Sequence, residues 1–165
     1  MDWEGVTGRL PEGVRVIFYP KDAQGRKIDT YLPAKGGEMK VPPGHYLAVI
    51  YNYDTEVVQV KGEDSYETIM ACTGNCTGLG DSETENMVWG PDNFYVATLD
   101  DVEIGKGEEL PTLEVRPKSV VTTYIFSIKT EGLKNVSSII GSVSGMAECY
   151  HLGKGAGLCR FAPIY

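Results

Sequence analysis

The cysteines are the residues of this chain with the most specific chemistry. They are Cys72, Cys76, Cys149 and Cys159. An even number is compatible with disulfides, which persist in oxidising compartments. The glycine-rich segment between Cys149 and Cys159 predicts a hairpin centred on Lys154, which would place these two cysteines opposite each other at a distance that a disulfide accepts. Cys72 and Cys76 bracket Gly74 in a tighter turn. We therefore expect the disulfides Cys149–Cys159 and Cys72–Cys76, with reduced thiols as the alternative.

Metal binding is a second interpretation of the same residues. The gap between Cys72 and Cys76 suits zinc, but the gap between the other two cysteines is too long for a ligand pair. Alternate carboxylates that calcium could use occur in two runs, Asp81, Glu83, Glu85 and Asp100, Asp101, Glu103. The first run lacks the glycine and the final glutamate of a calcium loop. We therefore assign no metal or cofactor and expect a solvated charged surface.

Catalysis has little support in the sequence. The only histidines, His45 and His151, lie in predicted strands near turns. A serine or cysteine hydrolase needs a nucleophile beside a histidine that a carboxylate orients, and no nucleophile-elbow sequence is present. Lysines between glycines, near Gly105 and Gly153, lack the spacing of a phosphate-binding loop. We expect no catalytic residues, solvated histidines and no enzyme activity.

The overall charge excludes some partners. The 165 residues carry a formal net charge of -8, whereas nucleic acid and anionic lipid headgroups attract basic surfaces. No apolar run approaches the roughly 20 residues that span a bilayer, and no signal peptide is visible at the start. If the protein is exported, we expect its signal to lie outside this sequence.

The elements that would position these residues are strands. Twenty glycines and nine prolines are spread along the chain, which favours short strands joined by turns. The rest of the chain is organised around the segment from Val41 to Glu56. Within it, the run from His45 to Tyr53 is apolar on both alternating faces, as expected for a strand in the middle of a sandwich.

Further strands follow from β-branched content and bounding turns. We expect them at Val14–Tyr19, Lys27–Leu32, Glu38–Val41, Val57–Val60, Ser65–Thr73, Phe94–Ile104, Val120–Lys129 and Val136–Leu152. A region rich in glycine, glutamate and proline between Gly105 and Lys118 predicts a boundary. We therefore expect an all-β protein with a sandwich of roughly seven strands over residues 1–110 and a partial or small second β domain over residues 111–165.

The ten tyrosines allow two interpretations. Tyr46, Tyr51 and Tyr53 follow one another along one predicted strand. Their rings could pack in a core or form a recognition surface, because a tyrosine has an apolar body and a polar tip. Core packing is the commoner arrangement.

Several of these segments together resemble a known family. They are DWEG near the start, GVRVIFYP, VPPGHYLAVIYNYDTE, the SYET segment at Ser65–Thr68, and SVVTTYIFSIKTEGLKNVSSIIGSVSGMAECYHLGKG. In this order they resemble the fimbrillin-like lipoproteins of Bacteroidales, and more narrowly an uncharacterised family related to the fimbrial anchor (minor fimbrillin) proteins of type V pili.

The resemblance implies a transthyretin-like or immunoglobulin-like β-sandwich followed by the start of a second one. It also implies export as a lipoprotein to the outer membrane or cell surface, with the lipid on a cysteine upstream of this chain. The expected function is non-enzymatic, in fimbria assembly or anchoring and cell adhesion, through sheet-edge pairing with other fimbrial subunits or surface proteins. The alternative is a carbohydrate- or peptide-binding module that uses exposed aromatics beside the loop from Gly74 to Asn86.

Overall fold

The protein is built almost entirely of β-strands. The structure is a computed structural model and describes residues 1–3, 6, 9–22, 24–74, 88–107, 111–139, 143–158 and 162–164. Over these residues, the helical structure is one short 3₁₀ turn, η2 (Leu133–Asn135). No helix in this described part is long and apolar enough to cross a membrane. The all-β prediction is confirmed.

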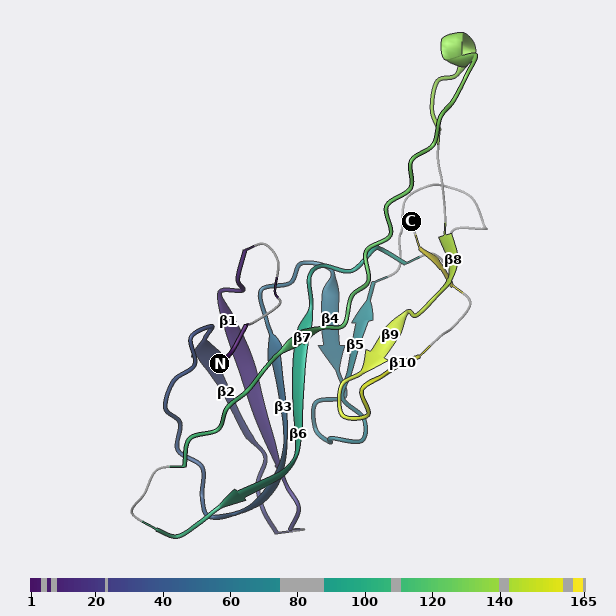
Figure 1. Ribbon diagram of the computed structural model, residues 1–165. Helices are drawn as coiled ribbons and strands as arrows, with labels where there is room; N and C mark the ends of the chain where they lie inside the picture. The colour runs from purple at the N-terminus through teal and green to yellow at the C-terminus, as the bar shows by residue number, and fades with distance from the viewer. Residues whose placement is uncertain are drawn as a thin grey trace.

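The larger sheet contains five strands in the order β2-β1-β3-β6-β7. Its strands are β1 (Gly13–Pro20), β2 (Ile28–Pro33), β3 (Gly44–Asn52), β6 (Tyr95–Ile104) and β7 (Lys118–Ser119). All neighbouring strands in it run antiparallel. β3 lies in the middle between β1 and β6 (Figure 1), as its apolar faces predict.

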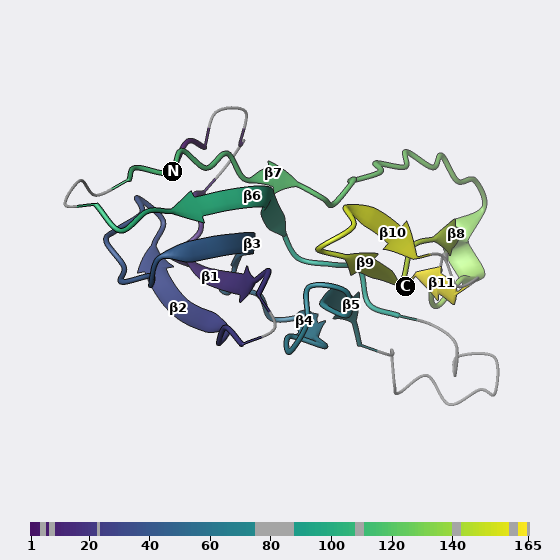
Figure 2. The same cartoon turned by 90° about the horizontal axis from the view of Figure 1, so that it is seen from below.

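A second sheet of four strands has the order β10-β9-β5-β4. Its strands are β4 (Val58–Lys61), β5 (Met70–Thr73), β9 (Cys149–His151) and β10 (Ala156–Leu158). A separate two-stranded sheet pairs β8 (Val143–Met146) with β11 (Ala162–Ile164). Figure 2 shows the five-stranded sheet beside the four-stranded one. The two sheets form the predicted β-sandwich.

Two apolar clusters cover the two faces of the five-stranded sheet. The inner core lies between the sheets and consists of Ile17, Tyr19, Val49, Tyr51, Val58, Ile69, Ala71, Phe94, Val96 and Leu152. The outer core lies on the other face and consists of Val14, Val16, Phe18, Tyr46, Ala48, Ile50, Val102 and Val115. Consecutive residues of β1 and β3 therefore belong alternately to the two clusters, because neighbouring side chains of a strand point to opposite faces.

The segment before β1 helps to cover the outer core. The Trp3 ring packs edge-on against Tyr95, with ring centroids 5.7 Å apart. Its indole Nε1 donates a hydrogen bond of 2.7 Å to the carbonyl of Ala34. Trp3 therefore anchors this segment against the outer core.

Some predicted elements differ from the observed ones. Residues 38–41 form no strand, and 65–69 form a turn before β5 begins at Met70. The predicted boundary at residue 110 is crossed by sheet pairing, because β7 pairs with β6 and β9 pairs with β5. The second domain is therefore wrong for β7, β9 and β10. It stays a prediction for the remainder of 111–165.

The segment predicted as the cleanest strand, Val120–Lys129, is not part of a sheet in the described structure. Residues 121–139, which we call the arm, leave β7, reach η2 at a far tip and return toward β8 (Figure 1). The alternating pattern is present in the sequence, but a strand also needs a neighbour to pair with. No described strand is paired with this segment.

Candidate functional site: an open edge of the larger sheet

The edge of the larger sheet beside β7 is largely unpaired. β7 covers β6 through only two residue pairs, Tyr95↔Ser119 and Val96↔Lys118. Past Val96, β6 continues to Ile104 with β3 on one side and no described strand on the other. Two-residue strands offer little ladder stability, so this edge is the natural place for another strand to pair.

The hydrogen-bonding direction of β6 can be followed from its contacts. The amide of Val120 donates to the carbonyl of Phe94 at 3.0 Å, so the backbone of Phe94 faces β7. The amide of Tyr95 donates to Asn52 Oδ1 at 2.8 Å, on the β3 side. Because successive residues of an antiparallel strand turn their backbone groups to opposite sides, Thr98 turns its amide and carbonyl toward the open edge.

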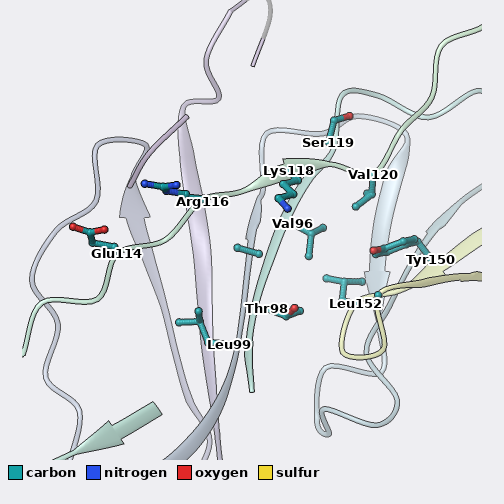
Figure 3. Close-up of a pocket in the computed structure, with 12 residues that line it drawn as sticks. Val96, Thr98, Leu99, Glu114, Arg116, Lys118, Ser119, Val120, Tyr150 and Leu152 are labelled. Atoms are coloured by element: carbon teal, nitrogen blue, oxygen red, sulfur yellow. The ribbon is translucent and has the colours of Figure 1, made fainter. Parts of the chain in front are cut away.

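A groove of about 560 Å³ lies along this edge. Its apolar lining is part of the sandwich interior: Leu152 is fully buried, Val96 is 7% exposed, and Val120 packs against the inner core. Figure 3 shows Val96, Val120, Tyr150 and Leu152 gathered between β6 and the β9–β10 hairpin. A strand placed here would extend the larger sheet and bury its apolar side chains against this lining.

Polar groups also line the groove. Tyr150 lies on the side of the groove that the β9–β10 hairpin forms, and burial raises the pKa of its phenol. Lys118 lies on the side of the groove that β7 forms, and it is exposed. Arg116 lies farther along with Glu114 (Figure 3), and its Nε is 2.9 Å from Asp2 Oδ2. The groove thus combines an apolar floor with a partly basic rim.

The disulfide predictions require correction. Cys72 of β5 is bonded to Cys149 of β9, with Cα atoms 4.2 Å apart. Each sulfur forms one such bond, so the pairings Cys149–Cys159 and Cys72–Cys76 are wrong. Cys76 and Cys159 lie outside the described residues.

The reason for this error is the register of the hairpin. The predicted β9–β10 hairpin exists, but Cys149 lies opposite Leu158 instead of Cys159. A shift of one residue moves a side chain to the other face of a strand. On its other side, Cys149 lies directly opposite Cys72, which is 77 residues away in sequence. A contact between residues so far apart cannot be recognised from local spacing.

The two histidines differ in their surroundings. His45 is exposed, as expected. His151 is only 6% exposed, so the expectation of a solvated side chain is wrong. Its Nδ1 accepts a hydrogen bond of 3.0 Å from the amide of Lys154, which leaves Nε2–H to donate to the carbonyl of Glu67 at 2.7 Å. Nδ1 therefore holds the turn of the hairpin, and Nε2 ties the hairpin to the β4–β5 loop.

The second acidic run binds protein groups. Tyr66 donates to Asp100 Oδ1 at 2.8 Å, and Lys21 Nζ donates to Asp101 Oδ1 at 2.6 Å. Asp81, Glu83 and Glu85 lie outside the described residues. Within the described ranges, no group of three or more histidine, cysteine, aspartate or glutamate side chains is arranged to hold a metal ion.

Sequence reasoning missed a charged cluster at the β2 side of the sandwich. Arg15 forms ion pairs with Asp29 and Glu63, and its Nη1 lies 3.0 Å from the Tyr51 hydroxyl. Hydrogen bonding to Arg15 is the main cause that lowers the pKa of Asp29, and hydrogen bonding to Asp29 is the main cause that raises the pKa of Arg15. Burial raises the pKa of the Tyr51 phenol. The sequence feature that could have revealed this cluster is Arg15, a single charged residue within the apolar run of β1.

The tyrosines divide between the two interpretations. Tyr46, Tyr51 and Tyr95 are buried, as core packing predicts. Tyr31 and Tyr53 are 58% and 43% exposed and pack edge-on against each other, with ring centroids 5.2 Å apart. This exposed pair lies beside the charged cluster, since Arg15 is 5.5 Å from the centre of the Tyr31 ring.

Comparison with known proteins adds two close similarities. The chain is 54% identical over all 165 residues to a Bacteroides ovatus protein named "Putative fimbrium anchoring subunit Fim4B", and it covers 50% of that protein. It also superposes on the crystal structure of a "putative adhesin" from Bacteroides ovatus, with a TM-score of 0.92 and 55% identity over 99% of this chain and 58% of the other. The chain therefore spans about half the length of these relatives.

These similarities confirm the resemblance to fimbrial anchor proteins and the β-sandwich fold. A family described as "Domain of unknown function (DUF5119)" matches residues 1–165, the whole of the chain. The chain belongs to this family.

Proposed function

We propose that this chain is part of a fimbrial anchoring or adhesive subunit on the cell surface and acts without catalysis. The names of the two Bacteroides ovatus relatives support this role. The Cys72–Cys149 disulfide supports a location outside the reducing cytosol. As a finer proposal, the protein is a lipoprotein of the outer membrane, held by a lipid on a residue upstream of this sequence.

The proposed mechanism is pairing of a partner strand with the open edge of β6. The observation that carries it is the combination of an unpaired β6 edge with a groove floored by the inner core. Backbone hydrogen bonds to Thr98 and its neighbours would provide affinity, and the groove would select apolar side chains at alternate positions. Lys118 on the rim would favour a partner strand with an acidic residue at that position.

The substitution Thr98→Pro tests this mechanism. Proline removes the amide that Thr98 turns to the open edge, and it is tolerated in edge strands whose amide faces outward. Thr98→Ala is the matched control, because it keeps the amide. In cells that lack the natural gene, we expect the Thr98→Pro variant to release fimbriae into the medium and the alanine variant to retain them.

The thermal unfolding of both purified variants shows whether the fold is intact. If Thr98→Pro unfolds at the same temperature as the alanine variant and still retains fimbriae, pairing at this edge is wrong. If both variants release fimbriae, the threonine side chain matters instead of the amide, which also contradicts strand pairing.

A second candidate function is glycan binding. The exposed pair of Tyr31 and Tyr53 favours it, because aromatic faces beside charged groups suit the stacking of a sugar ring. A glycan array with the chain and its Tyr31→Ala variant tests this possibility. Binding that the substitution abolishes would support a sugar site, and an array without any signal would argue against it.

A further inference from the structure

The β9–β10 hairpin forms one wall of the groove at the β6 edge, and His151 lies at the centre of this hairpin. Tyr150 and Leu152, the residues on either side of His151, line the groove, and so does Gly155 in the turn of the hairpin, residues 152–155. Figure 3 shows Tyr150 and Leu152 pointing toward β6. His151 does not line the groove and is only 6% exposed. The contacts of His151 therefore act on the groove through the hairpin.

One ring nitrogen of His151 holds the turn as a hydrogen-bond acceptor. Nδ1 lies 3.0 Å from the amide nitrogen of Lys154, which can only donate, so Nδ1 carries no proton in this arrangement. The amide of Gly155 donates to the carbonyl of His151 at 2.9 Å. Gly155 has a φ of 63°, which glycine adopts without strain. The turn that places Gly155 in the groove lining thus depends on bonds to His151.

The other ring nitrogen ties the hairpin to the β4–β5 loop. Nε2 lies 2.7 Å from the carbonyl oxygen of Glu67, which can only accept. The neighbouring Tyr66 connects the same loop to β6, because its hydroxyl donates to Asp100 Oδ1 at 2.8 Å. Gly153 packs so closely on Tyr66 that a Cβ at this position would lie 3.0 Å from the ring. The loop therefore connects the hairpin with the strand on the other side of the groove.

The charged groups beside the ring are already paired with each other. Lys154 Nζ of the hairpin and Glu67 Oε2 of the loop are 3.5 Å apart. β5 and β10 place Met70 and Ala156 opposite His151, and neither side chain can be ionised. A second proton on the ring would change Nδ1 from an acceptor into a donor that faces the donor amide of Lys154. Protonation therefore costs the bond that holds the turn.

We infer that His151 is a pH-sensitive positioning residue for the groove: its neutral ring keeps the turn closed, and a second proton opens the turn. The bond to the Lys154 amide is present while the ring is neutral and is lost as the pH falls from about 8 to about 5, the range in which histidine gains its charge. The bond from Nε2 to Glu67 survives protonation, so the hairpin stays attached there while Gly155 moves. Weaker binding of a partner strand in acid would follow. That consequence rests on the proposed function, whereas the opening of the turn does not.

Nuclear magnetic resonance of the isotope-labelled chain tests the inference without a ligand. Between about pH 8 and about pH 5, the ring nitrogens of His151 and the amides of Lys154 and Gly155 should shift with one common midpoint. After correction for intrinsic exchange, the Lys154 amide should exchange at least about tenfold faster in the protonated form, since it loses its acceptor. Amides of Val16 and Ile50 should stay in place and report that the larger sheet is folded.

The two histidines of the chain provide a matched pair of variants. His151→Asn removes the titrating ring but keeps an acceptor oxygen near the position of Nδ1, so the turn should stay closed over the whole pH range. His45→Asn removes the exposed histidine and should leave the response of the turn unchanged. A response that persists in His151→Asn, or that disappears in His45→Asn, would overturn the inference.

The natural chain alone is decisive if His151→Asn does not fold. A ring of His151 that gains its proton while the amides of Lys154 and Gly155 keep their positions and exchange rates would also overturn the inference. It would show that the turn is held without Nδ1.

Retention of fimbriae connects the turn to the groove. In cells that lack the natural gene, the natural chain should retain fimbriae at about pH 8 and lose them at about pH 5, whereas His151→Asn should retain them at both. Equal retention by the natural chain at both values, although the turn opens, would overturn the effect on the groove. Retention by Thr98→Pro at both values would instead contradict the proposed strand pairing, whatever the turn does.

Discussion

Strand β3 and the first part of the arm are both rich in β-branched and aromatic residues, but their surroundings are opposite. Along β3, the residues Ala48, Val49 and Ile50 are at most 1% exposed. Along the arm, the similar residue Ile125 is 92% exposed. β3 has β1 and β6 as neighbours and a cluster on each face, whereas the arm has no paired strand among the described residues. The comparison teaches that an apolar alternating sequence predicts an extended backbone, and that its partners decide whether the segment is buried.

The largest expected effect tests this comparison directly, by placing the same charge in both segments. Ile50→Asp should destabilise the chain by more than about 4 kcal/mol, because it buries an unpaired carboxylate. Ile125→Asp should change the stability of the 165-residue chain by less than about 0.5 kcal/mol, because that side chain is already in water. Urea unfolding followed by circular dichroism measures both. Similar losses from the two substitutions would show that the arm is packed in this chain.

An intermediate effect concerns the return of the chain from the arm to the sandwich. β3 is held by long ladders on both sides, but β9 pairs with β5 through only three residue pairs, one of which is Cys72↔Cys149. Removing the disulfide in the double variant Cys72→Ala, Cys149→Ala should cost about 4 kcal/mol, as expected for a closed loop of 77 residues. Urea unfolding without reductant measures it, and a loss below about 1 kcal/mol would show that strand pairing, the His151 hydrogen bond and the packing of Leu152 hold β9 without the disulfide.

The smallest expected effect concerns the charged cluster around Arg15. The described residues of the arm contain no comparable cluster. Asp29→Asn should cost about 1 kcal/mol at pH 7, since part of the ion pair is exposed to solvent. The pKa of Asp29 is lowered in the folded protein, so its contribution is complete above the ordinary aspartate pKa of about 4. The contribution is lost as the pH falls through the lowered value.

Unfolding of the natural chain and of Asp29→Asn should therefore converge as the pH is lowered from 4 toward 2. Thr55 has no charge to titrate, and its hydroxyl donates to the backbone carbonyl of Val58 at 2.9 Å, so Thr55→Val serves as a comparison. A difference between the natural chain and Asp29→Asn that stays constant down to pH 2 would show that Arg15 does not lower this pKa.

Much of the larger sheet could be predicted from the sequence. β1, β3 and β6 were expected nearly at their observed bounds, because their β-branched and aromatic runs end at prolines, glycines and polar residues. These signals are local. The segment around Glu38–Val41 failed because it packs over the outer core instead of pairing, as Met39 and Val41 show.

The features that sequence reasoning missed depend on long-range pairing. Cys72 and Cys149 meet because β9 adds to β5 across 77 residues, and a one-residue hairpin register decides which side chain of β10 lies opposite Cys149. The open edge of β6 could not be foreseen either. It exists because pairing with β6 begins only at Lys118, while residues 111–117 before it form no strand and place Val115 in the outer core.

The bridge between Cys72 and Cys149 also determines how this protein would respond to traction, the load that an anchoring subunit has to withstand. Force applied between the start of the chain and β10 would pass from β9 to β5 through the two sulfur atoms. The 77 residues that separate them could then add none of the roughly 270 Å that they would span when fully extended. Pulled in this way, the chain could lengthen only through the residues outside the bridged loop.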